Sequence, residues 1–190
     1  MKDFDFVAIG DIVTDAFIRL KDAEVHCSID KEKYELCMRF GDKIPYEFVE
    51  VVPAVGNSPN AAVSAARLGL KVAVVTDLGD DRNGEDSITS LKSNNVDTSF
   101  VTVHEGMKSN YHYVLWFNDD RTILVKHFEY PYKLPDIGVP KWVYLSSLGE
   151  HSIPYHREIT AYLKKNPSVK LAFQPGTFQI KLGAANLREI

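Results

Sequence analysis

Two apolar runs near the start of the chain predict strands. Residues 4–10 (FDFVAIG) form a short, mostly apolar run that ends at a glycine, and residues 14–20 are predicted as a second strand. A short apolar run bounded by turn residues is typical of a buried strand. Asp11 and Asp15 therefore lie close to the predicted carboxyl end of the first strand.

Residues 21–50 have a different pattern from the segments on either side. The stretches 24–29, 34–39 and 46–52 alternate polar and apolar residues, as half-exposed antiparallel strands do. We expect them to form a small β-sheet, a lid that projects from the main body. The predicted domains are this lid, residues 21–50, and an α/β core made of residues 1–20 and 51–190.

Helices and strands alternate from residue 55 onward. A helix rich in alanine runs to Leu68, where Ser58 is expected to cap its start and Gly69 to end it. Because small side chains let a helix lie close on a sheet, we expect this helix to be central. Further strands are predicted at residues 72–78, 99–103, 111–117, 121–127, 142–146 and 170–173, and helices at 84–94 and 154–165. This alternation predicts a three-layer α/β/α sandwich around a largely parallel sheet.

The end of the sequence does not complete an element. A helix-like stretch begins at Gly183, and Ile190 is the last residue. The predicted strand at 170–173 also lacks a full covering helix. The chain is therefore expected to be truncated.

Composition excludes several classes of protein. Hydrophobic residues make up 45% of the chain, enough for a packed core, and the net charge of −4 with no basic stripe argues against a nucleic-acid partner. The N-terminus predicts neither a signal peptide nor a membrane span. Cys27 and Cys37 are too few for a disulfide framework or a zinc site. We expect reduced thiols and a cytoplasmic protein.

Two polar segments are candidates for ligand binding. Ligands of open α/β sheets bind outside the carboxyl ends of the strands, where Asp11 and Asp15 can accept strong hydrogen bonds from vicinal hydroxyls of a sugar. Asn57 and Asn60 follow Gly56 at the helix start and offer both donors and acceptors, which suits a polyol. The alternatives are a turn cap for Asp11, solvation for Asp15 and an ordinary helix start at Gly56.

Together with the turn Gly79-Asp80-Asp81-Arg82-Asn83-Gly84, these segments resemble the ribokinase-like (PfkB) carbohydrate kinase family. Its Gly-Gly-x-x-x-Asn loop matches residues 55–60, and its Gly-Asp-Asp-x-x-Gly turn matches residues 79–84. The opening strand with Gly10 and Asp15 and the hairpin before Arg121 match as well. The resemblance runs from Phe4 to about Phe173.

The resemblance implies phosphorylation of a sugar or nucleoside hydroxyl with ATP and Mg²⁺. It implies that Asp15 is the main hydroxyl anchor, that Asp11, Gly56, Asn57 and Asn60 line the pocket, and that the lid is often a dimer clasp. Two features depart from the family. Val55 replaces the first glycine of the pair, and the Gly-Ala-Gly-Asp segment with the general-base Asp is absent. No catalytic residue is therefore assigned within this chain, which we expect to be a substrate-binding half that is inactive alone.

Two other functions remain open on the sequence alone. One is a non-catalytic sugar-binding or dimerisation module, and the other is a nucleotide-dependent oxidoreductase, against which the missing G-x-G-x-x-G counts. The histidines, which have no metal-ligand spacing, are expected to have no special role. Trp116 and Trp142 lie in predicted strands and are expected in the core.

Overall fold

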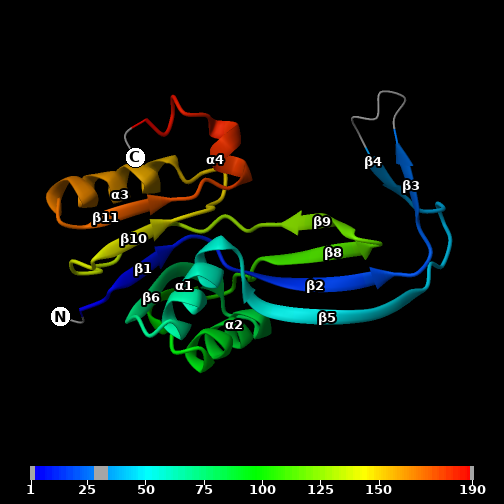
Figure 1. Ribbon diagram of the computed structural model, residues 1–190, viewed down its shortest axis with the longest axis horizontal. Coiled ribbons are helices and arrows are strands. Elements are labelled where there is room, and N and C mark those ends of the chain that lie inside the picture. Colours follow the sequence, from blue (N-terminus) through cyan, green and yellow to red (C-terminus); the bar gives the residue numbers. More distant parts are fainter. Residues whose placement is uncertain (1–2, 28–33, 189–190) are drawn as a thin grey trace. The chain divides into compact units, whose positions relative to one another are not determined.

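The computed structural model describes residues 3–27 and 34–188 of the chain (Figure 1). Its contacts divide the chain into two compact units. The first consists of Met1–Thr14, Pro53–Asn110 and His127–Ile190, and the second of Asp15–Val52 and Tyr111–Lys126. The second unit thus takes in more of the chain than the predicted lid of residues 21–50.

The first unit contains a five-stranded sheet in the order β11-β10-β1-β6-β7. All neighbouring strands in it are parallel. The strands are β1 (Phe6–Ile9), β6 (Val72–Gly79), β7 (Asp97–His104), β10 (Trp142–Leu145) and β11 (Lys170–Phe173). A parallel sheet needs crossover connections and cover on both faces, and the intervening helices supply both.

The two faces of this sheet carry separate hydrophobic clusters. Ile9 of β1 packs in one cluster with Ile159, while its neighbour Ala8 packs on the other face with Ala62. Figure 1 shows helices on both sides of the sheet. They are α1 (Asn57–Arg67), α2 (Arg82–Ser93) and α3 (Ile153–Lys165). The arrangement confirms the predicted α/β/α class.

Helix α1 is the central helix that its alanines predict. Ala62 is fully buried, and the helix contacts β1 and β6. It begins at Asn57 with Gly56 as its N-cap, so the expectation that Ser58 caps it is wrong. Ser58 already lies inside the first turn and is buried, where its side chain makes no capping hydrogen bond.

The second unit contains a four-stranded sheet, in the order β5-β2-β8-β9, and a two-stranded sheet. The strands of the larger sheet are β2 (Val13–Leu20), β5 (Tyr46–Val55), β8 (Tyr111–Phe117) and β9 (Asp120–Lys126), and those of the smaller are β3 (Glu24–Cys27) and β4 (Tyr34–Cys37). The stretch 46–52, predicted as the third strand of the small sheet, instead extends as β5 beside β2. Residues 28 and 29 of the first predicted stretch lie outside the described residues.

The predicted helix from Gly183 is wrong. The helix in this region is α4 (Thr177–Leu182), and Gly183 follows it with a φ of 77°. A glycine in the left-handed region commonly ends a helix, because it lacks the Cβ that makes this conformation unfavourable. Residues 184–188 form turns, and residues 189 and 190 lie outside the described residues.

Both tryptophans are more exposed than the sequence predicts. Trp116 is 36% exposed and Trp142 is 42% exposed. The guanidinium carbon of Arg19 lies 4.5 Å from the ring centroid of Trp116, and the ammonium of Lys170 lies 5.3 Å from that of Trp142. Long cationic side chains therefore cover these rings in place of a packed core.

The turn at residues 79–84 holds α2 against the segment before β8. The carboxylate of Asp81 accepts hydrogen bonds from the Gly84 amide at 3.1 Å and from the Ser109 hydroxyl at 2.7 Å. Partial burial alone raises the pKa of Asp81, but the hydrogen bonds from Ser109 and Gly84 outweigh it and hold this pKa below its usual range. A Cβ on Gly84 would lie 2.3 Å from the Gly79 carbonyl oxygen, so the turn closes only with glycine there.

Replacing Asp81 with alanine should lower the free energy of unfolding by about 1–2 kcal/mol, because the helix loses its cap and Ser109 loses an acceptor. The pKa of Asp81 is lower in the folded chain than in the unfolded chain. Its ionised form therefore contributes stability above the unfolded pKa, and this contribution is lost as the pH falls through the folded pKa. Thermal unfolding between about pH 6 and about pH 3 should show the difference in Tm between wild type and variant shrinking with acidification.

Asp80→Ala is the matched control, because the Asp80 carboxylate accepts one hydrogen bond, from the Gly106 amide. It should cost less stability than Asp81→Ala. A difference in Tm between wild type and Asp81→Ala that stays constant across the acid range would contradict the assignment.

Candidate functional site

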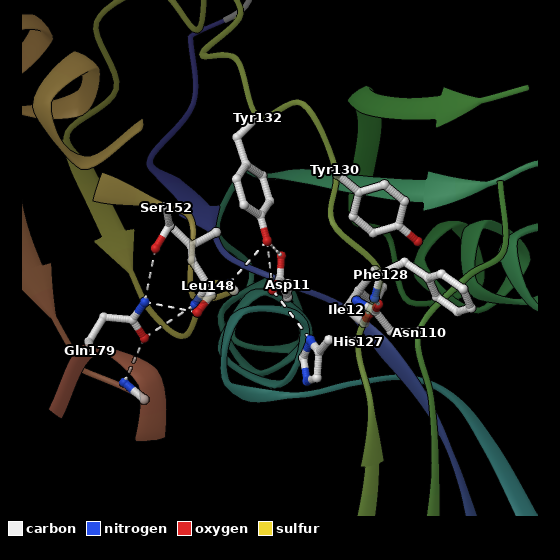
Figure 2. A network of polar contacts seen from close by, with 12 residues as sticks. Asp11, Ile12, Asn110, His127, Phe128, Tyr130, Tyr132, Leu148, Ser152 and Gln179 are labelled. Carbon is white, nitrogen blue, oxygen red and sulfur yellow. Dashed lines mark hydrogen bonds and ion pairs between the residues drawn. The ribbon is translucent and has the colours of Figure 1, made fainter. Parts of the chain in front are cut away.

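Asp11 lies directly after β1, at the carboxyl edge of the parallel sheet, and its side chain is buried. Both carboxylate oxygens accept hydrogen bonds from the hydroxyl of Tyr132, at 2.9 and 3.0 Å. Nδ1 of His127 lies 3.6 Å from one of them. Figure 2 shows Tyr132 and His127 directed at this carboxylate from two sides. A buried carboxylate needs such donors, because burial without them is costly.

Tyr132 links Asp11 to the loop that follows β10. Its hydroxyl accepts a hydrogen bond from the Gly149 amide at 3.0 Å, and its ring stacks on that of Tyr155 with the centroids 5.4 Å apart. Burial and the negative charge of Asp11 both raise the pKa of Tyr132. The phenol therefore stays protonated and donates to Asp11. No pattern in the sequence indicates this role.

Gln179 of α4 holds the same loop from the other side (Figure 2). Its Nε2 donates to the Leu148 carbonyl oxygen at 2.9 Å and its Oε1 accepts from the Leu148 amide at 3.3 Å. Nε2 also contacts the Ser152 hydroxyl at 3.3 Å. The fully buried amide thus fixes the backbone on both sides of Leu148.

The loop before α1 approaches the end of β1. Gly56 has a φ of 120°, and a Cβ there would lie 3.2 Å from the Asp11 carbonyl oxygen. The structure therefore brings the Gly56 backbone next to that of Asp11. Asn57 is half-buried at the start of α1, and Asn60 is exposed about one turn further along.

Val55 stands where the resembled family has its first glycine, and the residue before it is the one with an unusual backbone. Ala54 has a φ of 59°, in a region that residues with a Cβ seldom adopt. Ala54 is also buried. The end of β5 thus reaches Gly56 through one alanine with a positive φ.

Asp15 belongs to the second unit, whereas the other four predicted site residues belong to the first. It lies on β2, and its Oδ1 is 3.3 Å from Nδ1 of His112 on β8. Its side chain is only 18% exposed. Asp15 is therefore largely buried beside a histidine, and the alternative of simple solvation does not describe it.

Asn110 connects three segments of the first unit. Its Nδ2 donates to the Ile12 carbonyl oxygen at 3.2 Å, its Oδ1 accepts from the Phe128 amide at 2.8 Å, and its own carbonyl oxygen accepts from the Thr14 amide at 3.1 Å. The side chain is buried, and Figure 2 shows it beside Ile12 and Phe128. It fixes the backbone just after Asp11 and just after His127.

A further buried carboxylate, Asp77 of β6, also has a histidine beside it. His104 approaches it to 2.7 Å. Burial raises the pKa of Asp77, and the hydrogen bond and charge of His104 oppose this effect. Within residues 3–27 and 34–188, no three His, Cys, Asp or Glu side chains come together as a metal-ion site.

Replacing Tyr132 with phenylalanine should lower the free energy of unfolding by about 1–3 kcal/mol, because Asp11 then remains buried without its main donor. Chemical denaturation would measure the loss. Tyr155→Phe is the matched control, because that ring stacks on Tyr132 but its hydroxyl does not contact Asp11. Equal stability of Tyr132→Phe and wild type would show that the hydrogen bonds to Asp11 contribute nothing to the fold.

Comparison with solved structures confirms the fold. Ribokinase from Giardia lamblia superposes with a TM-score of 0.74 at 13% sequence identity, covering 98% of this chain and 55% of that one. Arabidopsis thaliana ribokinase, solved with ribose and ATP, gives a TM-score of 0.71 at 16% identity, covering 90% of this chain and 53% of that one. The chain therefore spans about half the length of the solved structures that it matches.

Curated relatives match over shorter segments. A 5-dehydro-2-deoxygluconokinase from Geobacillus thermodenitrificans is 32% identical over 101 residues, which cover 53% of this chain and 24% of that protein. Mouse ribokinase is 46% identical over 46 residues, 24% of this chain and 14% of that protein. The model of the pfkB family carbohydrate kinases matches residues 30–155, more than half of the chain. The chain therefore belongs to the pfkB family of carbohydrate kinases.

Proposed function

We propose that the chain is the substrate-binding part of a kinase that phosphorylates a hydroxyl group of a sugar or nucleoside with ATP and Mg²⁺. The observation that carries the proposal is the buried Asp11 at the carboxyl edge of the parallel sheet, with the Gly56 backbone beside it. This edge is where open α/β sheets bind their ligands. Membership of a carbohydrate kinase family supports the same substrate class.

The proposal gives the polar residues different tasks. Asp15 is the main anchor for substrate hydroxyls, since a carboxylate accepts strong charge-assisted hydrogen bonds. Asn57 and Asn60 supply donors and acceptors, and Gly56 allows close approach of the backbone. Asp11 also binds substrate, and a substrate hydroxyl must share its carboxylate with Tyr132.

The general base is proposed to belong to a Gly-Ala-Gly-Asp segment, which this sequence lacks. Phosphoryl transfer requires a base for the hydroxyl proton and neutralisation of charge on the transferred group. ATP would be the phosphoryl donor and Mg²⁺ would neutralise its phosphates. A ribokinase from Cryptococcus neoformans solved with ADP supports nucleotide use in the family. We propose that the 190 residues bind substrate in the cytoplasm but do not transfer phosphate.

A non-catalytic sugar-binding or dimerisation module is the second candidate. Formation of ADP that depends on added sugar separates the two candidates. A protein that contains this chain and turns over ATP only with sugar present is a kinase. Sugar binding without any turnover identifies a module.

None of the described helices is long and apolar enough to cross a membrane.

Asp15→Ala should weaken sugar binding by about 10- to 150-fold, the equivalent of one charge-assisted hydrogen bond of about 1.5–3 kcal/mol. Calorimetric titration with a panel of pentoses, hexoses and nucleosides would measure it. Asp120→Ala removes a carboxylate of the same unit whose side chain is 91% exposed, and it should leave binding unchanged. Unchanged affinity in Asp15→Ala for every sugar that the wild type binds would defeat the anchor assignment.

We also propose that the lid forms a homodimer with a second copy. Val25 and Leu36 pair across β3 and β4, and Val25, Tyr34 and Met38 are exposed. Exposed apolar side chains on a two-stranded sheet are unfavourable in water, and pairing of two lids buries them. Ile29, predicted on the same face as Val25, lies outside the described residues. The alternative is that each lid folds down on its own subunit.

Leu36→Glu should convert the dimer to a monomer, because it places a charge in the buried interface. Analytical ultracentrifugation over a range of concentrations would show the change in mass. Glu35→Lys, on the opposite face of β4, serves as the control. A wild type that is monomeric at every concentration, or a dimer that tolerates Leu36→Glu, would rule the interface out.

A further inference from the structure

Asp15 has a fixed neighbour on the adjacent strand. β2 and β8 lie side by side in the four-stranded sheet, and Nδ1 of His112 is 3.3 Å from Oδ1 of Asp15. The two side chains are 18% and 13% exposed. Two half-buried ionisable groups at this distance, on hydrogen-bonded strands, have little freedom to move apart.

The Asp15 oxygen nearest to His112 is the one that needs a donor. Oδ1 is closed off from water and has no well-aligned hydrogen bond from any described residue. A buried acceptor without a donor is costly, and more so when it is charged. The exposed 18% of the Asp15 side chain therefore excludes Oδ1.

Other cationic groups on this face of the sheet are engaged elsewhere. Alternation along β2 places Arg19 on the same face as Asp15, but Arg19 donates to the Asn118 carbonyl oxygen at 2.7 Å and lies over Trp116. On β9 the residue opposite His112 is Val125, which has no charge. The ring N–H of His112 is thus the nearby group that can hold Oδ1.

We infer that His112 is a positioning residue for Asp15. Its Nδ1–H holds Oδ1, so that the second carboxylate oxygen faces a substrate hydroxyl in a fixed direction. The inference rests on the proposed function, in which Asp15 is the hydroxyl anchor. An acceptor that is already oriented binds more tightly, because less freedom is lost when the ligand arrives.

Substitutions at His112 test this role through sugar affinity. His112→Leu leaves Oδ1 buried without a donor, which favours rotation of the carboxylate away from its binding orientation, and affinity should fall about tenfold. His112→Asn can place an amide N–H where Nδ1 was, and it should retain affinity within about threefold of wild type. A residue that only fills space would show the opposite order, because leucine replaces the ring volume better than asparagine does.

The experiment is a double-mutant cycle on the whole chain, with the sugar and nucleoside panel in calorimetric titration. His112→Leu should weaken binding in the wild type but add no further loss in the Asp15→Asn variant. Wild-type affinity in His112→Leu, with a clear loss in Asp15→Asn, overturns the inference and leaves the proposed function standing. Unchanged affinity in Asp15→Asn overturns the proposed function instead.

A measurement without ligand decides the pairing independently. In ¹⁵N-histidine NMR spectra of the chain, His112 should show a protonated Nδ1 whose resonance shifts in Asp15→Asn and stays in place in the Asp120→Ala control. If no member of the panel binds to the wild type, the proposed function fails, and the spectra still decide the pairing. An Nδ1 resonance that is the same in wild type and Asp15→Asn overturns the inference.

Discussion

The amide side chain of Asn110 is the interaction on which the candidate site depends most. The chain passes between the two compact units close to Thr14, Asn110 and His127. The Asn110 backbone carbonyl accepts from the Thr14 amide, and its side chain hydrogen bonds the Ile12 carbonyl oxygen and the Phe128 amide. Only a short side chain with both a donor and an acceptor can do this, since aspartate has no N–H to give. The hydrogen bond to Ile12 thereby holds the backbone one residue after Asp11.

Burial of negative charge is the second constraint, and at three largely buried carboxylates a histidine lies close by. Asp11, Asp15 and Asp77 each lie beside a histidine, and Asp11 also receives the Tyr132 hydroxyl. Carboxylates at or near strand ends remain available for function only if neighbouring donors offset the loss of water. In Asp11 this support occupies both oxygens, so a ligand has to compete with an internal donor.

The sequence predicts the elements of the first unit well, because buried parallel strands and an alanine-rich helix have strong local signatures. β11 has the predicted bounds, and α1 covers the sheet as its small residues indicate. The alternation of polar and apolar residues at 46–52 correctly indicates a half-exposed strand. However, a two-residue period does not tell which other strand this one pairs with. In the structure, β5 pairs with β2 and not with β4. The histidine–aspartate pairs join residues far apart in sequence, and no local pattern encodes them.

The segment from Pro53 to Pro59, which joins the end of β5 to the start of α1, has a consequence for how a ligand would be received. Pro53 and Pro59 fix their own φ angles, Val55 is β-branched, and Ala54 is held at a φ of 59°. The two prolines and Val55 restrict this segment already in the unfolded chain, so its folding costs less conformational entropy. A molecule that reaches Gly56 meets a backbone with little left to order, and its association should need no slow rearrangement of this loop.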